Sequence, residues 1–316
     1  MERKRIVVGV IMGGTSSERE ISLKTGKSVA NALSEAGYTV KEIVLNEDSV
    51  EPIEKEKIDV AFIAMHGKFG EDGELARLLE ERKIPYTGSG PEGAKVAMDK
   101  VLTKKAFNAF GVPTAEYIVL DSSVSSEEAD WFIKRHLNGY PVVVKPAREG
   151  SSVGISIVDM RSELQDALVK AFGFDNKILV EKYISGREVT CGILDGRPLP
   201  LVELRPSRRF FDFKAKYQDP GTLYIINPHL EPRLYRLCQE VALCAHIAVG
   251  ARDFSRVDMI LQERKIFVLE VNTIPGLTER SLLPKAAAAI GVDYQTLCIK
   301  MLEMALRRRK CLSESA

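Results

Sequence analysis

The chain has 316 residues, 45% of them hydrophobic and 28% charged, the composition of a globular protein that needs no disulfide or metal to complete its core. Its 45 Lys and Arg residues nearly balance its 44 Asp and Glu residues, which argues against a general nucleic-acid or membrane-surface partner. The five cysteines show no CxxC spacing, and we interpret them as reduced thiols of a cytoplasmic protein. No apolar run approaches the ~18 residues that would span a bilayer.

The first third of the chain alternates predicted strands and helices. Short apolar runs at Ile6–Met12, Val40–Leu45 and Ile58–Met65 are typical of buried parallel strands. Helical spacing predicts one helix that ends before Gly37 and another over Leu75–Glu81. This alternation predicts an N-terminal α/β domain with a doubly wound parallel sheet.

The middle of the chain opens with a predicted helix over Met98–Phe110 and continues as a mixed segment. Strands are expected at Tyr117–Leu120, Val142–Lys145, Gly154–Val158 and Ile178–Tyr183, and helices at Ser126–Leu137 and Ser162–Phe172. These elements predict a small α+β domain with helices on one face of its sheet.

After Gly186 the pattern changes to hairpins and long helices. Asp195-Gly196 predicts a tight turn between strands Val189–Leu194 and Leu199–Leu204. Residues 206–222 lack regular signals, which in a compact domain is typical of a functional loop. Helix Leu234–Val249, strands Val257–Leu261 and Ile266–Val271, and helices Leu282–Ile290 and Tyr294–Arg309 complete the prediction. The resulting domains are residues 1–97, 98–185 and 186–316.

Two clusters in the last third have a simple structural interpretation. The basic residues from Arg307 to Lys310 follow an apolar helical run, and cations are favoured at a helix C-terminus. Cys238, Cys244 and His246 could be metal ligands, but they lie in an apolar helix, so we prefer small core residues.

The two strands after the long helix predict a metal site. Alternate residues of a strand share a face, so Asp258 and Arg256 point one way, as do Glu270 and Asn272. The apolar residues predicted to face the core are Val257, Met259 and Leu261 on the first strand and Phe267, Leu269 and Val271 on the second. A three-residue turn would pair Leu261 with Phe267 and Asp258 with Glu270. Two carboxylates and an amide oxygen are ligands that Mg²⁺ prefers. A solvated strand face with an Arg256–Glu270 ion pair is the alternative.

Two further segments could bind a ligand, although each is a weak signal when taken alone. Lys145 ends a strand and precedes a Gly- and Ser-rich turn, Gly150 to Gly154, whose N–H and hydroxyl groups could cradle phosphate. A plain hairpin is the default interpretation there. Glu181, Tyr183 and Glu188 end another strand and could bind adenine and ribose, although an edge strand with solvated charges is the simpler reading.

Together these segments resemble the ATP-grasp superfamily, and within it the D-alanine–D-alanine ligase family. The motifs that carry the resemblance, in chain order, are Gly13-Gly-Thr-Ser-Ser-Glu18-Arg-Glu, Met65-His66-Gly67 with Gly70-Glu-Asp-Gly73, Tyr86-Thr-Gly-Ser-Gly90, Met98-Asp99-Lys100, Lys145-Pro to Gly154, Arg256-Val-Asp258, and Glu270-Val-Asn-Thr-Ile-Pro-Gly276-Leu-Thr. They cover nearly the whole chain, and all of them in order are very unlikely by chance. Ile274 and Glu279-Arg280 depart from the commonest versions of the pattern.

The resemblance implies a three-domain ATP-grasp architecture and a set of residues for ATP and metal. ATP and two Mg²⁺ (or Mn²⁺) would bind between the central and C-terminal domains. The residues implied at the phosphates are Lys100, Lys145, Ser152 and Lys216; at adenine and ribose Glu181, Tyr183, Ile184 and Glu188; and at the metals Asp258, Glu270 and Asn272. A homodimer is the implied assembly.

The resemblance also implies the D-alanine sites. Glu18 would bind the ammonium of the first D-alanine, linked to Ser151 and Tyr217, with His66 nearby. Arg256, the Gly276 N–H, Ser281 and Leu282 would surround the second D-alanine and the reacting carbonyl. Lys216-Tyr217 is the pair expected in an enzyme that forms a dipeptide rather than a D-lactate ester, and residues 206–222 would form a lid.

The implied reaction has two steps, and three alternatives to it remain. A D-alanine carboxylate attacks the ATP γ-phosphate to give an acyl phosphate, and the amine of the second D-alanine then displaces phosphate. The alternatives are an ATP-grasp ligase for other substrates, a nucleotide-binding regulator without catalysis, and a dehydrogenase. The dehydrogenase is disfavoured because Gly13-Gly14 lacks GxGxxG spacing.

Overall fold

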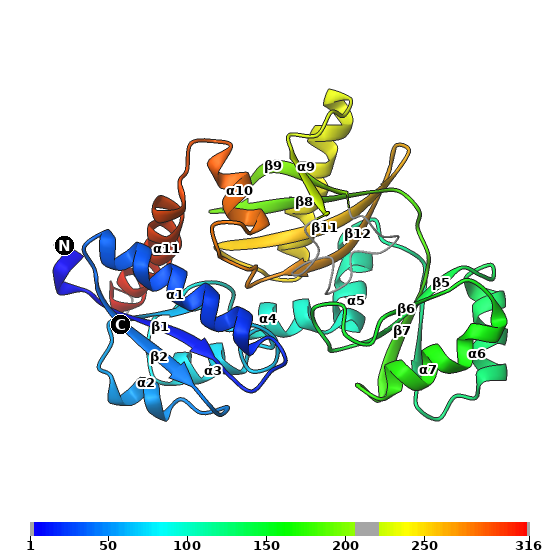
Figure 1. Ribbon diagram of the computed structural model, residues 1–316, viewed down its shortest axis with the longest axis horizontal. Helices are drawn as coiled ribbons and strands as arrows, with labels where there is room; N and C mark the ends of the chain where they lie inside the picture. The colour runs from blue at the N-terminus through cyan, green and yellow to red at the C-terminus, as the bar shows by residue number, and fades with distance from the viewer. Residues whose placement is uncertain (1–2, 206–220, 315–316) are drawn as a thin grey trace.

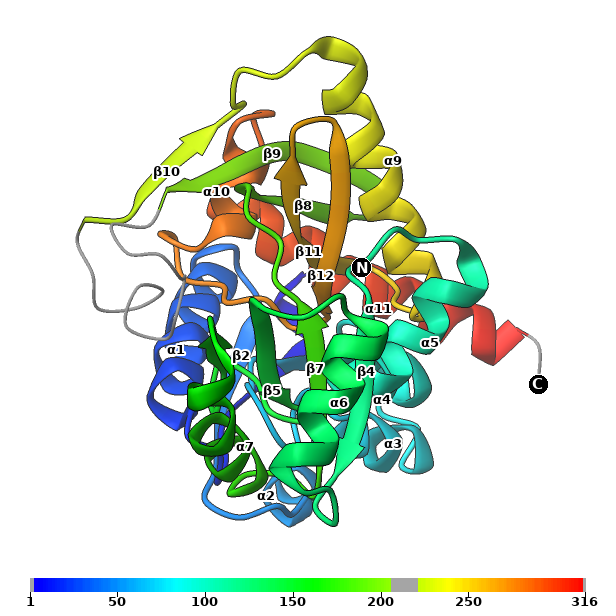
Figure 2. The ribbon, with the colours of Figure 1, turned by 90° about the vertical axis from the view of Figure 1, so that its right-hand side faces the viewer.

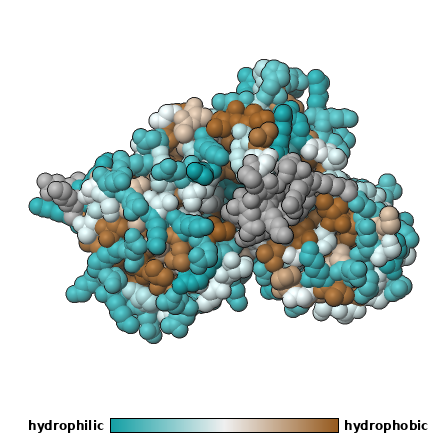
Figure 3. Space-filling view, in the orientation of Figure 1, coloured by the Kyte–Doolittle hydropathy of each residue, from teal (hydrophilic) through white to brown (hydrophobic). Residues whose placement is uncertain are grey.

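The computed structural model describes residues 3–205 and 221–314, whose strands form three sheets. Figure 1 shows the chain starting at the left of the molecule, crossing to a separate unit at the right, and returning to its start. On the face drawn in Figure 3, hydrophilic residues predominate and hydrophobic ones gather in separate patches. None of the helices in the described residues has the length and apolar character needed to cross a bilayer.

The N-terminal part is a parallel sheet with helices on both faces, as the sequence predicted. Its strand order is β2-β1-β3. The elements are η1 (Arg3–Arg5), β1 (Val7–Gly13), α1 (Arg19–Glu35), β2 (Thr39–Leu45), α2 (Glu51–Lys55), β3 (Val60–Ile63), α3 (Glu74–Glu81) and α4 (Pro91–Met98). Val8 and Val10 of β1 pack toward α1, whereas Ile11 packs toward α2 and α3. The period of two in β1 therefore sends apolar side chains into a core on each side.

The middle part is an antiparallel sheet with strand order β4-β7-β5-β6. It comprises β4 (Tyr117–Asp121), α6 (Ser126–His136), β5 (Val142–Pro146), β6 (Ser156–Val158), η2 (Arg161–Glu163), α7 (Leu164–Phe172) and β7 (Lys177–Lys182). α6 and α7 cover the same face of this sheet, as expected, and the core beneath them contains only residues of this part (Figure 2). Ser125 caps α6 through a hydrogen-bonded box with Glu128.

The third sheet is antiparallel, with strand order β10-β9-β8-β11-β12. Its strands are β8 (Arg187–Leu194), β9 (Arg197–Arg205), β10 (Leu223–Ile226), β11 (Phe254–Gln262) and β12 (Lys265–Asn272). The Asp195-Gly196 turn is confirmed, with both residues at positive φ, while β10 was not predicted. α9 (Pro232–Ala248) covers one face, and α10 (Leu282–Ala288) packs on β8 and β9. Cys238 and His246 are buried on the inner face of α9, as the core interpretation expects, and Cys244 is half-buried against the same core.

The β11–β12 hairpin differs from the prediction near its turn. The turn is one residue tighter, so Gln262 pairs with Lys265 and Leu261 with Ile266. A β-bulge at Leu269 then restores the predicted pairing of Asp258 with Glu270. As a result Ile266 and Val268 join the core. The prediction that Phe267 and Leu269 face the core was therefore wrong, whereas that for Val257, Met259, Leu261 and Val271 is confirmed.

Two helices pack against a different part of the chain from the domain to which the sequence analysis assigned them. α5 (Lys100–Phe110) packs against α9, and its Phe107 lies in the core of the third sheet. α11 (Tyr294–Glu314) packs against α1 and β3 at the other end of the chain. The first and third parts thus share a continuous core, which runs from Val8 to Leu302.

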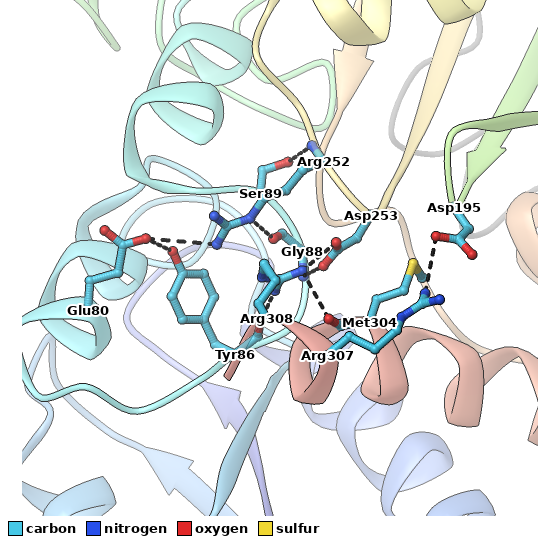
Figure 4. A network of polar contacts seen from close by, with 10 residues as sticks. All are labelled: Glu80, Tyr86, Gly88, Ser89, Asp195, Arg252, Asp253, Met304, Arg307 and Arg308. Atoms are coloured by element: carbon cyan, nitrogen blue, oxygen red, sulfur yellow. Dashed lines mark hydrogen bonds and ion pairs between the residues drawn. The ribbon is translucent and has the colours of Figure 1, made fainter. Parts of the chain in front are cut away.

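A polar network ties the same two parts together (Figure 4). Arg308 of α11 donates to the Tyr86 carbonyl oxygen at 2.5 Å and also contacts the Asp253 carboxylate. Asp253 accepts from the Gly88 N–H at 3.1 Å, and Arg252 donates to the Gly88 carbonyl oxygen at 2.9 Å. Arg308 is therefore an interface residue. The prediction that this basic cluster lies at the helix C-terminus was wrong, because α11 continues to Glu314 and has no basic residue in its last turn.

Candidate active site

A cavity of about 680 Å³ lies where the first part, α5 and the third sheet meet. It draws residues from α1, from the turn after β5, from β11 and β12, and from the loop before α10. The predicted site residues that line it are Glu18, His66, Lys100, Ser151, Arg256, Glu270, Asn272, Gly276, Ser281 and Leu282. Segments distant in sequence therefore converge here as predicted.

Glu18 is held by the Gly- and Ser-rich turn. It is 7% exposed at the start of α1, and its carboxylate accepts a hydrogen bond from the Ser151 hydroxyl. Ser151 and Ser152 both have positive φ, a conformation that turns the backbone sharply at this point. Lys100 fastens the same turn, because its ammonium donates to the Glu149 carbonyl oxygen at 2.5 Å.

His66 lies beside Glu18 with a polar partner on each ring nitrogen. Its Nε2 is 3.1 Å from the Thr25 hydroxyl, and its Nδ1 is 3.4 Å from the Glu71 carboxylate. Burial alone would lower the pKa of His66, but Glu71, helped by Glu18, outweighs burial and raises it. The Gly67 N–H donates to Glu71 at 3.0 Å, so this carboxylate is fixed by the backbone.

The predicted metal donors lie together on the β11–β12 hairpin. Asp258 is directly opposite Glu270, and Arg256 is directly opposite Asn272. Both Asp258 oxygens accept from Arg256, at 2.8 and 2.7 Å, and one also accepts from the Thr190 hydroxyl at 2.7 Å. The ion pair considered between Arg256 and Glu270 is thus replaced in the structure by one between Arg256 and Asp258. Two carboxylates and an amide oxygen on adjacent strands are the donor types that would suit Mg²⁺, and Asp258 already has Arg256 as a partner.

The loop before α10 closes the cavity from another side. The Ser281 hydroxyl accepts from the Thr278 N–H at 3.1 Å, and the Ser281 N–H donates to the Thr278 carbonyl oxygen at 2.9 Å. Ser281 precedes α10 yet makes no side-chain cap bond, because its hydroxyl is used inside the loop. The Asn272 side chain accepts from the Ile274 N–H at 3.0 Å and fixes the start of this loop.

Comparison with known proteins identifies the family. The family models described as the D-ala D-ala ligase C-terminus and N-terminus match residues 106–303 and 46–89. The D-alanine–D-alanine ligase of Syntrophotalea carbinolica is 44% identical over 309 residues, which cover 98% of each chain. This chain belongs to the D-alanine–D-alanine ligase family. That of Carboxydothermus hydrogenoformans is also 44% identical, over 96% of this ligase and 99% of the relative.

Solved structures of the family share the fold. The D-alanine–D-alanine ligase from Bacillus anthracis superposes with a TM-score of 0.86 at 39% identity, over 96% of this chain and 99% of that one. The same enzyme complexed with ATP superposes with a TM-score of 0.85 at 36% identity, over 96% and 99%. The ligase is thus an ATP-dependent enzyme that joins D-alanine to D-alanine for peptidoglycan synthesis, and the dehydrogenase alternative falls away.

The residues predicted at adenine and ribose lie outside the cavity lining. Tyr183 and Ile184 follow β7, and Glu188 is on β8, so they border the link between the middle and third sheets. The Tyr183 N–H donates to the Pro141 carbonyl oxygen at 3.2 Å. Ser152 adjoins Ser151 in the turn but does not line the cavity. Lys216 and Tyr217 lie outside the described residues.

Sequence reasoning missed Lys104 of α5. The buried carboxylate of Glu181 contacts the ammonium of Lys104 through one oxygen and that of Lys145 through the other. Burial would raise the pKa of Glu181, but the two ammonium groups outweigh it and lower the pKa to about 2. The Glu181 side chain is therefore held between two lysines. Lys104 is one helical turn after Lys100, and that spacing was the only signal of it.

Proposed function

We propose that this ligase binds both D-alanine molecules in the 680 Å³ cavity and ATP beside it, between the middle and third sheets. The observation that carries the proposal is that one cavity is lined by a carboxylate, Glu18, and by two cations, Lys100 and Arg256. A zwitterionic amino acid and an anionic triphosphate need groups of both signs.

The first D-alanine would lie with its ammonium at Glu18. Ser151 holds that carboxylate by a hydrogen bond, and His66, whose pKa is raised by Glu71, is the neighbouring donor. This orientation directs the substrate carboxylate toward Lys100 and the phosphates. An oxygen of that carboxylate attacks the γ-phosphorus of ATP, the bond to the bridging oxygen breaks, and ADP leaves.

Lysines would hold the triphosphate during this step. Lys100 lines the cavity, and Lys145 lies at the end of β5, before the Gly- and Ser-rich turn. Desolvation lowers the pKa of Lys100 although Glu270 opposes the shift. We assign two Mg²⁺ (or Mn²⁺) to Asp258, Glu270 and Asn272; when bound, they would reduce the charge repulsion between the triphosphate and the attacking carboxylate.

The second D-alanine would lie between Arg256 and the loop of Gly276, Ser281 and Leu282. Its amine, once deprotonated, attacks the acyl carbon, and phosphate leaves as the peptide bond forms. Arg256 and the Gly276 N–H are the groups assigned to the developing oxyanion, a role worth roughly 3–4 kcal/mol per donor in other enzymes.

ADP release with ATP, Mg²⁺ and D-alanine, beside L-alanine and D-lactate, tests the proposal. We expect turnover with D-alanine alone. Glu270→Gln should lower kcat by at least about tenfold, since it removes a charged metal donor. Glu263→Gln, on the exposed turn of the same hairpin, is the matched control and should behave like the wild type. Turnover only with a different amino acid would overturn the substrate assignment, and ATP binding without any turnover would favour the regulator alternative.

We also propose a cytoplasmic homodimer with sequence domains bounded at residues 97 and 185, across which α5 and α11 pack. Free thiols at Cys191, Cys238, Cys244 and Cys298 support a reducing compartment. Sedimentation at several protein concentrations tests the assembly, for which a monomer at all concentrations would be the contrary result.

A further inference from the structure

Lys104 lies at the junction of α5, the middle sheet and the third sheet. Its side chain is 1% exposed, which is rare for a lysine without partners. The ammonium contacts the Glu181 carboxylate of β7 and the Thr114 hydroxyl. Thr114 in turn donates to the Val268 carbonyl oxygen of β12 at 2.7 Å. The lysine therefore fixes Glu181 relative to the strand that carries Glu270.

Among the three groups in direct contact the charges do not cancel, and the neighbouring Lys100 and Glu270 add one charge of each sign. Lys104 and Lys145 contribute two positive charges, and Glu181 contributes one negative charge between them. Lys104 and Glu181 are enclosed, whereas Lys145 is 8% exposed at the end of β5. Uncompensated charge in a protein interior is costly unless a counter-ion binds. Of these three groups, Lys145 is thus the one whose positive charge an anion can reach.

We propose that Lys104 is a positioning residue for ATP: it neutralises Glu181 from behind and so leaves the charge of Lys145 for the triphosphate. Without Lys104, Glu181 and Lys145 form a closed neutral pair. That pair attracts phosphate less and holds the Lys145 ammonium against Glu181. The inference rests on the proposed contact of Lys145 with phosphate. The test below separates the role of Lys104 from that contact.

Nucleotide titration of the intact ligase measures the effect. Lys104→Met should weaken ATP and ADP binding by about 10- to 100-fold, the size of one charge-assisted contact. Adenosine, which has no phosphate, should bind equally to both proteins. The double variant Lys104→Met with Glu181→Gln should recover most of the ATP affinity, because Lys145 again has no neutralising partner. A purely structural lysine would give no such recovery.

Control variants show whether a contrary result rules out the role of Lys104 or that of Lys145. Lys105→Met, which takes a charge from the exposed side of the same helix, should leave ATP affinity unchanged. If Lys104→Met is too unstable to titrate, Lys104→Gln takes its place with the same expectation. Wild-type affinity in the Lys104 variant, or no recovery in the double variant, overturns the inference alone. Unchanged ATP affinity in Lys145→Met overturns the phosphate role of Lys145 and the inference with it.

Discussion

At the scale of single residues, His246 shows how burial sets the response of this ligase to acid. It lies in the last turn of α9, 5% exposed, with Nδ1 2.7 Å from the Ser255 hydroxyl. Burial lowers the pKa of His246 to about 4, from an ordinary value of 6.5. Between these values the unfolded chain binds the extra proton. The contribution of His246 to stability is therefore complete above about pH 6.5 and is lost as the pH falls toward 4.

The free energy of unfolding, measured in urea at pH 7 and pH 5, should reveal this proton. We expect the wild type to lose about 2 kcal/mol more over this interval than His246→Gln, in which no imidazole titrates. The exposed His136 offers a control, since His136→Gln should keep the wild-type dependence. Equal losses in the wild type and the His246 variant would show that the proton is taken up in the folded state.

At the scale of elements, the bulge in β12 decides which side chains reach the active site. Val268 is buried completely, and its neighbour Leu269 lines the cavity next to Glu270. Without the bulge, strict alternation counted back from Glu270 would have exchanged the two environments. The bulge adds one residue to β12, so Leu269 and Glu270 both line the cavity while the pairing of Asp258 with Glu270 is kept.

Truncation of these neighbours should therefore have opposite effects. Val268→Ala should cost roughly 1–3 kcal/mol of unfolding free energy, by lost burial and an unfilled cavity, with little change in KM for ATP. Leu269→Ala should cost less than about 1 kcal/mol but raise a substrate KM. Urea denaturation and steady-state kinetics on both variants check this. A larger stability loss at Leu269 would mean that β12 has no bulge.

The bulge also marks where prediction from sequence stops. Alternation, turn chemistry and apolar runs were enough for the parallel sheet and the Asp195-Gly196 hairpin. The predicted pairing of Asp258 with Glu270 was right only because the bulge offset the error of one residue at the turn. These signals could not locate an extra residue in Ile266-Phe-Val-Leu269, because all four residues are apolar and suit either face. β10 was not predicted because it directly follows the segment 206–222, whose sequence lacks regular signals.

Which side chains pair with each other in the site was harder to predict than which residues line the cavity. The motifs brought Glu18, His66, Lys100, Arg256 and Glu270 to one cavity correctly. They did not indicate that Glu181 is enclosed by two lysines or that Arg256 pairs with Asp258. Such partners depend on how separate sheets meet, which periodicity along a single strand does not encode.

At the scale of the whole molecule, Arg308 joins the first and last parts of the chain. Its partner Asp253 has a side chain only 9% exposed, and Arg308 is 28% exposed. The neighbouring Arg307 pairs with Asp195 at 3.1 Å, but both of those side chains are 62% exposed. Solvent screens the second pair much more than the first.

The two arginines should therefore differ when each is removed. Arg308→Ala should lower the free energy of unfolding by about 1–3 kcal/mol, since it leaves the buried Asp253 carboxylate without its cation and the Tyr86 carbonyl oxygen without the arginine donor. Arg307→Ala should change it by less than about 1 kcal/mol. Thermal or urea melts of both variants provide the comparison. Equal effects would argue that the interface depends on apolar packing alone.

The position of α11 has a consequence for the order in which the parts of this protein fold. The apolar face of the first sheet is covered by α1 and by α11, whose Leu297 and Met301 lie in the same core as Val8. A ribosome releases β1 long before α11. The nascent first sheet therefore keeps part of its apolar face uncovered until α11 has emerged. Packing of the first sheet is completed only then, whereas the core of the middle sheet contains no residue of α11 and can form earlier.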